Sequence, residues 1–359
     1  MRGPAPTQPP MPDAGRRLTP VVRVAPAKLN LSLAVLGRRA DGFHDLHSVM
    51  VPLELADRLS LARAATADDT LRVEGLDAGP MAANLVLRAI AASRAAVGRA
   101  ADAFPLAARL EKRIPVAAGL GGGSSDAAAT IDGALEAWGV LDPDGPPDKE
   151  IEALRATIAA RVGSDVPFFL AGRPALVEGR GERVTPLGPI RGVAPGVVLV
   201  TPRVPSSTAA VFAAVDGGGP ASPSDPRSTR LTSEHLATEL RAGLTAASLV
   251  ARAGVLASAN DLAPAAAVVV EGLTGLRRAL ARRLGRPVGV SGSGPTLWLL
   301  YASGSEAEVA AGAIRPGFED GSLVAPGQAV PSIIATSFAG PASREPTSVT
   351  SSEDMEERP

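Results

Sequence analysis

The stretch from residue 114 to residue 126 reads Ile114-Pro115-Val116-Ala117-Ala118-Gly119-Leu120-Gly121-Gly122-Gly123-Ser124-Ser125-Asp126. Four of the five residues from Gly119 to Gly123 are glycine, so the backbone can adopt positive φ and bring its N–H groups close to an anion. Apolar residues at helical spacing follow: Ala127, Ala128, Ile131, Leu135 and Trp138. The turn therefore opens onto a helix N-terminus, whose unpaired amides and dipole favour negative charge, and we predict a phosphate site here.

Two common phosphate-binding motifs do not fit this stretch. A Walker A loop needs a lysine after its last glycine, and here Ser124 follows directly. The dinucleotide fingerprint needs a third glycine or alanine at the same position. A flexible Gly-Ser linker is the remaining alternative. It is disfavoured because the stretch lies between an apolar segment and a well-patterned amphipathic helix.

The composition sets limits on fold and partners. A chain of 359 residues with 45% hydrophobic content can form two domains of about 150 residues each. Its 36 basic and 37 acidic residues leave a net charge of −1, which gives no reason to expect nucleic acid or an anionic membrane as a partner. The chain has no cysteine and three histidines, so thiolate metal sites are excluded and a histidine-rich metal centre is disfavoured.

The two ends differ from the middle of the chain. Residues 1–19 are rich in proline, lack the apolar segment of a signal peptide and are expected to be a disordered leader. Residues 339–359 are expected to be a disordered tail. The Pro- and Gly-rich segment 186–196 is the best domain boundary, which predicts an N-terminal domain at 20–190 and a C-terminal domain at 191–338. No segment approaches the roughly 18 apolar residues of a membrane span. We expect a soluble cytoplasmic protein, a monomer or weak homodimer.

The apolar periodicity predicts several elements between these ends. Short strands are expected at residues 49–53, 58–62, 197–200 and 297–301, and helices at 85–97, 151–162, 206–215, 233–249 and 265–284. Residues 216–230, rich in Gly, Pro, Ser and Asp, are expected to form a mobile loop.

Three polar residues outside the glycine turn each allow two interpretations. Lys28 and Asn30 lie two apart on an extended segment, so they point the same way, about 7 Å apart, and either line a cleft or form an ordinary surface face. Asp165, between a helix end and an apolar segment, either caps a short turn or is a carboxylate near a site, and the pattern alone favours the cap. Asn84 is a good N-cap for the helix that follows, and this is favoured over contact with a ligand.

Taken together, Lys28, Asp165 and the glycine turn match what phosphoryl transfer to a hydroxyl requires. That reaction needs amide donors and cations around the phosphoryl oxygens and a base near the nucleophile. The turn from Gly119 to Ser125 would hold the nucleotide phosphates, with Ser124 or Ser125 available to Mg²⁺. Asp165 would take the hydroxyl proton, and Lys28 would orient it and offset negative charge.

Three stretches of the chain resemble the GHMP kinases. They are Pro26-Ala27-Lys28-Leu29-Asn30-Leu31, the segment from Pro115 to Ser125, and Ser291-Gly292-Ser293-Gly294-Pro295. The resemblance extends from about residue 21 to residue 338. Two further stretches, Arg39 to His44 and Gly163 to Phe169, resemble the members of this family that act on a cytidine diphosphate sugar alcohol.

The resemblance implies an α+β fold, with an N-terminal domain like ribosomal protein S5 domain 2 that binds ATP and a C-terminal ferredoxin-like plait. It implies ATP with Mg²⁺ as cofactors, a small-molecule substrate, and Lys28 and Asp165 as the catalytic pair. The implied ATP-binding residues are Asn84, Pro115, Val116, Ala117, Ala118, Gly119, Leu120, Gly121, Gly122, Gly123, Ser124 and Ser125. The implied substrate-binding residues are Asn30, Phe43, His44 and Phe212, with the two phenylalanines on either side of the cytosine ring. Many members have tyrosine where this chain has Phe43, which keeps the stacking face and loses the hydroxyl.

Two other functions remain open from the sequence. The first is a GHMP kinase of another small alcohol, of the mevalonate or homoserine type; the aromatic residues Phe43 and Phe212 argue against it, since a small acid needs no aromatic clamp. The second is a non-catalytic nucleotide-binding regulator. It predicts a damaged catalytic pair, whereas Lys28 and Asp165 are both present.

Overall fold

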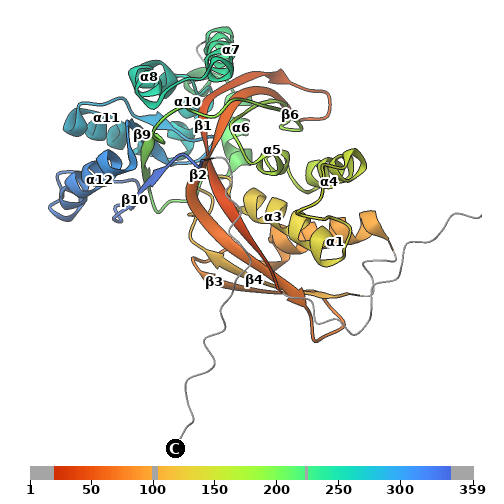
Figure 1. The fold of residues 1–359 in the computed structure, drawn as a ribbon. Coiled ribbons are helices and arrows are strands. Elements are labelled where there is room, and N and C mark those ends of the chain that lie inside the picture. The colour runs from red at the N-terminus through yellow and green to blue at the C-terminus, as the bar shows by residue number, and fades with distance from the viewer. Residues whose placement is uncertain (1–19, 99–103, 223–224, 341–359) are drawn as a thin grey trace, which may run out of the picture.

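Two long antiparallel strands, β1 (Val21–Arg38) and β2 (His44–Arg63), form the centre of the first half of the molecule (Figure 1). The computed structural model describes residues 20–98, 104–222 and 225–340. A six-stranded sheet has the order β3-β4-β2-β5-β6, with β1 also paired to β2. Its other strands are β3 (Thr70–Gly75), β4 (Leu106–Lys112), β5 (Ala175–Gly179) and β6 (Arg183–Pro186).

The prediction of two short strands at residues 49–53 and 58–62 was wrong. Both segments are parts of the single strand β2, which pairs with β1 from His44 to Pro52 and again from Ala56 to Leu61, with a register shift between the two stretches. The irregularity falls at residues 53–55, between the two predicted segments, but the strand itself is not broken, and the polar residue Asp57 that follows is buried and hydrogen-bonded.

Four helices pack together on the first sheet. They are α1 (Leu85–Val97), α3 (Gly122–Ala137), α4 (Lys149–Val162) and α5 (Val166–Ala171), and a short 3-10 turn η1 (Met81–Ala83) precedes α1. Helix α1 connects the parallel neighbours β3 and β4, and the Asn84 side chain caps it by accepting a bond of 2.9 Å from the Val86 amide. Helix α3 lies close to the sheet, since a Cβ on Gly133 would come within 2.7 Å of Leu61. The predicted helix at 85–97 is confirmed.

The second half contains a four-stranded antiparallel sheet of order β10-β7-β9-β8. Its strands are β7 (Gly196–Thr201), β8 (Gly289–Val290), β9 (Leu297–Tyr301) and β10 (Ser332–Ser337). Its helices are α6 (Thr208–Asp216), α7 (Pro226–Ala242), α8 (Ala246–Ala251), α9 (Ala253–Ser258), α10 (Ala263–Val269), α11 (Leu273–Leu284) and α12 (Gly304–Glu319), with a 3-10 turn η2 (Gly219–Ala221). The predicted strands at 197–200 and 297–301 are confirmed, as is an α+β fold with two sheets.

Several predictions for the second half need correction. Residues 216–230 do not form one loop, because α7 begins at Pro226, where Asp225 caps it by accepting from the Arg227 amide. The helices predicted at 233–249 and 265–284 are each divided, because Gly243 (φ +93°) ends α7 and Gly272 (φ +86°) precedes α11. The predictions of a disordered leader at 1–19 and of a disordered tail fall on residues outside the described ranges, except for 339 and 340.

Strand β1 contributes to three separate hydrophobic cores. Val21 and Ala25 pack into the core under α1 and α3. Leu29 and Leu31 belong to a second core that also contains residues of β7 and β9. Leu33, together with Val35, belongs to a third core formed mostly by the second half. In Figure 1 most of the second half lies against one side of β1 and β2, and α1, α3, α4 and α5 gather on the other.

The two halves are also joined by hydrogen bonds. The Leu33 amide donates to Ala259, and Leu55 donates from its amide to the Thr336 hydroxyl at 3.0 Å. The first sheet ends at Pro186 and the second begins at Gly196, on either side of the predicted boundary. None of the helices within the described ranges is long and apolar enough to cross a membrane.

Replacing His47 with glutamine is expected to make the protein less sensitive to acid. His47 is buried on β2, and burial lowers its pKa below the ordinary 6.5, with a smaller lowering from Arg230 and opposing effects from Glu178 and Glu234. As pH falls below 6.5, the unfolded chain therefore binds a proton that the folded state does not, and the free energy of unfolding drops by at most about 1.4 kcal/mol per pH unit. Urea unfolding between about pH 7.5 and about pH 5.5 measures this loss. Equal losses in parent and variant would contradict the prediction.

Candidate active site

A cavity of about 340 Å³ lies between the two halves of the molecule. The first half contributes its lining from β1, from the glycine turn and from the segments around Asn84 and Asp165. The second half contributes Thr208, Phe212, Gly292 and Ser293, among others. The cavity therefore brings together all three stretches that resemble the GHMP kinases.

The glycine turn leads directly into the N-terminus of α3. Gly119 (φ +80°) and Gly121 (φ +71°) take the left-handed conformation. The helix starts at Gly122, within the predicted turn from Gly119 to Ser125 instead of after it. The N-cap residue Gly121 has no side chain to cap the helix, and the first internal bond is made by the Ser125 amide to Gly121 at 2.9 Å. The amides of the first helical turn before Ser125 therefore remain for a ligand.

A second glycine turn packs against the first, backbone to backbone. The Ser291 hydroxyl donates to the Gly119 carbonyl at 3.0 Å, and a Cβ on Gly119 would lie 2.1 Å from the Ser291 carbonyl oxygen. A Cβ on Gly294 would lie 2.2 Å from Ala118. Asn260 holds the second turn in place, because its amide group donates to the carbonyls of Val290 and Gly292, each at 2.9 Å. No side chain fits between the two turns.

Lys28 is buried at the point where these turns meet. Its backbone amide donates to Leu120 at 2.9 Å, and its ammonium lies 2.5 Å from Asn30 Oδ1. Asn30 in turn donates from Nδ2 to Ser48 at 2.9 Å. Lys28 and Asn30 are 4% and 1% exposed, so the interpretation as a surface face was wrong. Both line the cavity.

Asp165 faces Lys28, and its Oδ2 lies 3.5 Å from the lysine Nζ. It occupies the N-cap position of α5, yet its side chain makes no capping bond, so the favoured interpretation as a cap was wrong. The segment is held from outside, since Gly181 (φ +124°) packs so closely that a Cβ there would lie 2.2 Å from the Ser164 carbonyl oxygen. With one third of its side chain exposed, Asp165 lines the cavity and can reach a substrate there.

The other residues predicted to bind the nucleotide fall into two groups. Asn84 and residues 115–124 line the cavity, and Asn84 also caps α1. Ser125 does not line it, because its side chain is buried in α3. Of the two serines considered for Mg²⁺, only Ser124 is therefore in the cavity. The part of the chain that the structure describes has no group of three or more His, Cys, Asp or Glu side chains able to hold a metal. Magnesium would thus depend mainly on phosphate oxygens, as it commonly does.

A buried cluster beneath the turn was not predicted. The Lys112 ammonium donates to Asp57 and, at 2.8 Å, to Asp126, and the other oxygen of Asp57 accepts the amides of Arg113 and Ile114. Burial raises the pKa of Asp126 to about 7, an effect that Lys112 opposes and Asp57 reinforces. Lys112 and Asp126 line the cavity. The sequence signal for this cluster was a lysine, Lys112, just before the glycine turn. Nothing in the local sequence pattern indicates that this lysine contacts Asp57.

Of the four predicted substrate residues, Asn30 and Phe212 line the cavity, whereas Phe43 and His44 do not. Phe212 lines it and stacks on His44, with ring centroids 4.7 Å apart and planes 22° from parallel. Phe43 is 49% exposed and does not line the cavity, and the Arg180 guanidinium lies 4.9 Å above its ring. The structure therefore brings His44 together with Phe212, whereas it pairs Phe43 with an arginine.

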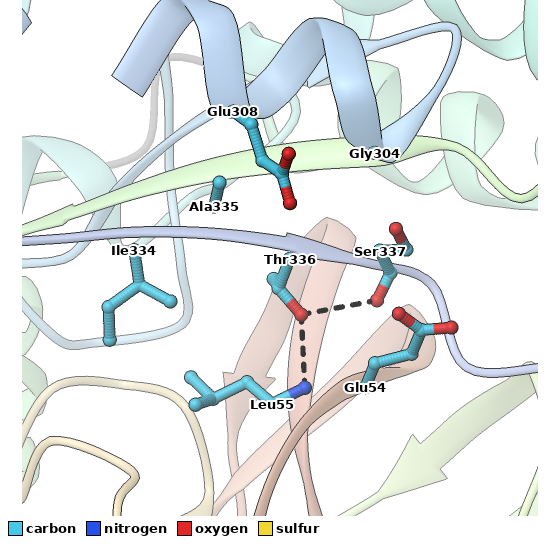
Figure 2. Close-up of a pocket in the computed structure, with 8 residues that line it drawn as sticks. All are labelled: Glu54, Leu55, Gly304, Glu308, Ile334, Ala335, Thr336 and Ser337. Carbon is cyan, nitrogen blue, oxygen red and sulfur yellow. Dashed lines mark hydrogen bonds between the residues drawn. The ribbon is translucent and has the colours of Figure 1, made fainter. Parts of the chain in front are cut away.

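A second hollow of about 290 Å³ lies at the junction of β2, β10 and α12 (Figure 2). Glu54 and Glu308 approach it from β2 and α12, and the bonds from Leu55 to Thr336 and from Thr336 to the Ser337 carbonyl cross its floor. It has no cationic side chain and no glycine turn among its lining residues. The cavity at Lys28 is therefore the candidate active site.

Several known proteins are similar to this chain in sequence and in fold. Residues 84–173 match the family model for the GHMP kinases N terminal domain. A protein named 4-diphosphocytidyl-2-C-methyl-D-erythritol kinase from Rhizobium leguminosarum bv. trifolii is 36% identical over 309 residues, which cover 85% of this chain and 94% of that relative. A relative of the same name from Symbiobacterium thermophilum is 48% identical over 186 residues, and there the match spans 52% of this chain and only 61% of the relative. A crystal structure of 4-(cytidine 5'-diphospho)-2C-methyl-D-erythritol kinase is similar with a TM-score of 0.60 and 31% identity, over 89% of this chain and 100% of that one.

Proposed function

Since this chain belongs to the GHMP kinase family, we propose that it transfers the γ-phosphoryl group of ATP to the 2-hydroxyl of 4-diphosphocytidyl-2-C-methyl-D-erythritol. The observation that carries the proposal is the pairing of Lys28 with Asp165, 3.5 Å apart, beside a glycine turn at a helix N-terminus. The names of the relatives supply the substrate. The product would be a precursor of isoprenoids in the non-mevalonate pathway.

The glycine turn would bind the nucleotide phosphates. Left-handed Gly119 and Gly121 and the uncapped start of α3 offer amide donors, and a Cβ at either glycine would collide with the neighbouring protein atoms. Lys112 lines the base of this site, where its ammonium is paired with Asp57 and Asp126. Mg²⁺ would neutralise phosphate charge when bound, with Ser124 as the hydroxyl nearest to hold it.

Asp165 would act as general base. As the hydroxyl oxygen forms its bond to the γ-phosphorus and the bond to the ADP oxygen breaks, Oδ2 of Asp165 takes the hydroxyl proton. Lys28 keeps the carboxylate oriented and offsets the charge on the phosphoryl oxygens. Its own position is maintained by Asn30 and by the backbone bond to Leu120. A pair that is already aligned needs little reorganisation during the reaction.

The substrate class separates this proposal from a kinase of another small alcohol. A cytosine ring offers a flat face to aromatic side chains, and Phe212, which lines the cavity and is backed by the stacked ring of His44, offers such a side chain. Mevalonate or homoserine would leave this surface unused. A non-catalytic regulator would have no use for an aligned lysine and carboxylate.

The proposal is tested by measuring ADP release with Mg-ATP and 4-diphosphocytidyl-2-C-methyl-D-erythritol. We expect turnover with this substrate, competition by CMP, and no turnover with mevalonate or homoserine. Turnover of mevalonate or homoserine without competition by CMP would support the other kinase class. Binding of ATP without turnover of any of the three would contradict the proposal and support a regulator.

A further inference from the structure

Asp216, the last residue of α6, places its carboxylate between two residues of the β1–β2 hairpin. Its Oδ1 lies 2.8 Å from His44 Nε2, and its Oδ2 lies 3.6 Å from Arg38 Nε. Residues 216–230 were predicted to be a mobile loop, so Asp216 had no expected role. A carboxylate at the C-terminal end of a helix is unfavourable in the field of the helix dipole. Its position there is explained by its partners on the hairpin.

Helix α6 contacts both the face and the edge of the His44 imidazole ring. Phe212 and Asp216 lie four residues apart, on one side of the helix. The Phe212 ring stacks on the imidazole, and the Asp216 carboxylate bonds to one of its nitrogens. His44 is 9% exposed. The imidazole therefore has a fixed plane and a fixed orientation next to the part of the cavity that Phe212 lines.

The carboxylate also decides which nitrogen of His44 carries the proton. A carboxylate only accepts hydrogen bonds, so at 2.8 Å Nε2 must be the N–H donor. In the neutral imidazole the other nitrogen, Nδ1, then has no proton and acts as an acceptor. No hydrogen bond joins Nδ1 to any residue in the described ranges. His44 thus keeps one acceptor for a ligand.

We propose that Asp216 is a positioning residue that holds His44 as the hydrogen-bond acceptor for the exocyclic amino group of a pyrimidine ring, and so selects cytosine over uracil. The inference rests on the proposed function, because it assumes a cytidine nucleotide against Phe212 and His44. Cytosine carries an amino group at the position where uracil carries a carbonyl oxygen. An acceptor at Nδ1 bonds to the amino group and opposes the carbonyl oxygen. A site built to bond one such group rejects the analogue that lacks it.

The variant Asp216→Asn tests the proposal, since an asparagine can either accept from Nε2 or donate to it and therefore no longer fixes the tautomer. We expect the preference for CMP over UMP as competing ligands to fall about tenfold, with a similar rise in KM for the cytidine substrate. The values of kcat and of KM for ATP should stay within about twofold of the parent. An unchanged ratio of CMP to UMP affinity would overturn the proposal.

Asp45→Asn is the matched control. Asp45 lies on the same hairpin, and its carboxylate accepts from Arg39 at 2.8 Å and bonds to no histidine. This control removes the same charge, and the preference for CMP should remain. Loss of the preference in both variants would mean that only the charge of the hairpin matters and would overturn the proposal.

A measurement on the unchanged protein does not depend on any variant folding. Nitrogen-15 NMR of the histidine rings should show His44 protonated at Nε2 and unprotonated at Nδ1 in its neutral form. The opposite tautomer would overturn the proposal. The proposed function can fail separately: a chain that prefers CMP to UMP but phosphorylates none of the tested alcohols would support this inference and contradict the kinase reaction.

Discussion

Replacing Asp165 with asparagine is expected to lower kcat by about 10²- to 10⁴-fold while KM for ATP and for the substrate changes by less than about threefold. An amide has nearly the shape of the carboxylate but cannot take the hydroxyl proton. The side chain is one third exposed and makes no capping bond in α5, so the fold should be kept. Steady-state kinetics with both substrates varied would give the two constants separately.

Asp148→Asn is the control for this variant. Asp148 caps α4 by accepting from the amides of Glu150 and Ile151, and asparagine caps helices equally well. The control therefore makes the same chemical change on an exposed residue of a nearby helix, and its kcat should match the parent. If Asp165→Asn also retained full kcat, a base at this position would be excluded and the mechanism would need another proton acceptor.

Replacing Gly119 with alanine is expected to reduce kcat/KM for ATP by more than about tenfold and to lower stability by about 1–3 kcal/mol. Gly119 has φ +80°, and a Cβ there would meet the Ser291 carbonyl oxygen at 2.1 Å and the Gly294 amide at 2.8 Å. The two glycine turns must therefore separate, and the amides proposed to bind the phosphates would move with them. Kinetics at varied ATP, together with urea unfolding, would measure both effects.

Gly139→Ala separates backbone strain from the clash. Gly139 follows α3, has φ +69°, and has no atom within 4 Å of its ideal Cβ position. This control should lose about 1 kcal/mol of stability from the left-handed backbone and keep its affinity for ATP. Equal losses of kcat/KM in the two variants would show that contact between the turns is not what positions the nucleotide.

The features that sequence reasoning predicted well are encoded locally. Glycines at successive positions, followed by helical periodicity, predicted the turn and the helix after it, and the observed α3 differs mainly in starting at Gly122. Short apolar stretches bounded by Gly and Pro predicted β7 and β9. In each case the information lies within a few residues, where steric rules for the backbone and the alternation of side chains act directly.

The features that were missed depend on contacts between distant parts of the chain. Asp165 faces Lys28 of β1 instead of capping α5, and the adjacent Ser164 is packed against Gly181 of the β5–β6 turn. Lys112 at the end of β4 forms ion pairs with two carboxylates, Asp126 of α3 and Asp57 of the separate strand β2. For such positions local propensity offers only the commoner role, a cap or a solvated charge, and tertiary packing decides otherwise. Functional sites are where this disagreement is expected.

The three cores that β1 enters have a consequence for how the protein is made. Val21 and Ala25 can be buried once the first sheet forms, but Leu33 has its partners in the second half of the chain. The ribosome releases β1 before the second half, so the strands and helices that enclose its far end emerge much later. That end stays exposed to chaperones and to mispairing until residues as late as Ile333 have been synthesised. Lys28 lies between the two parts, so catalytic competence is expected to arrive only with the last steps of folding.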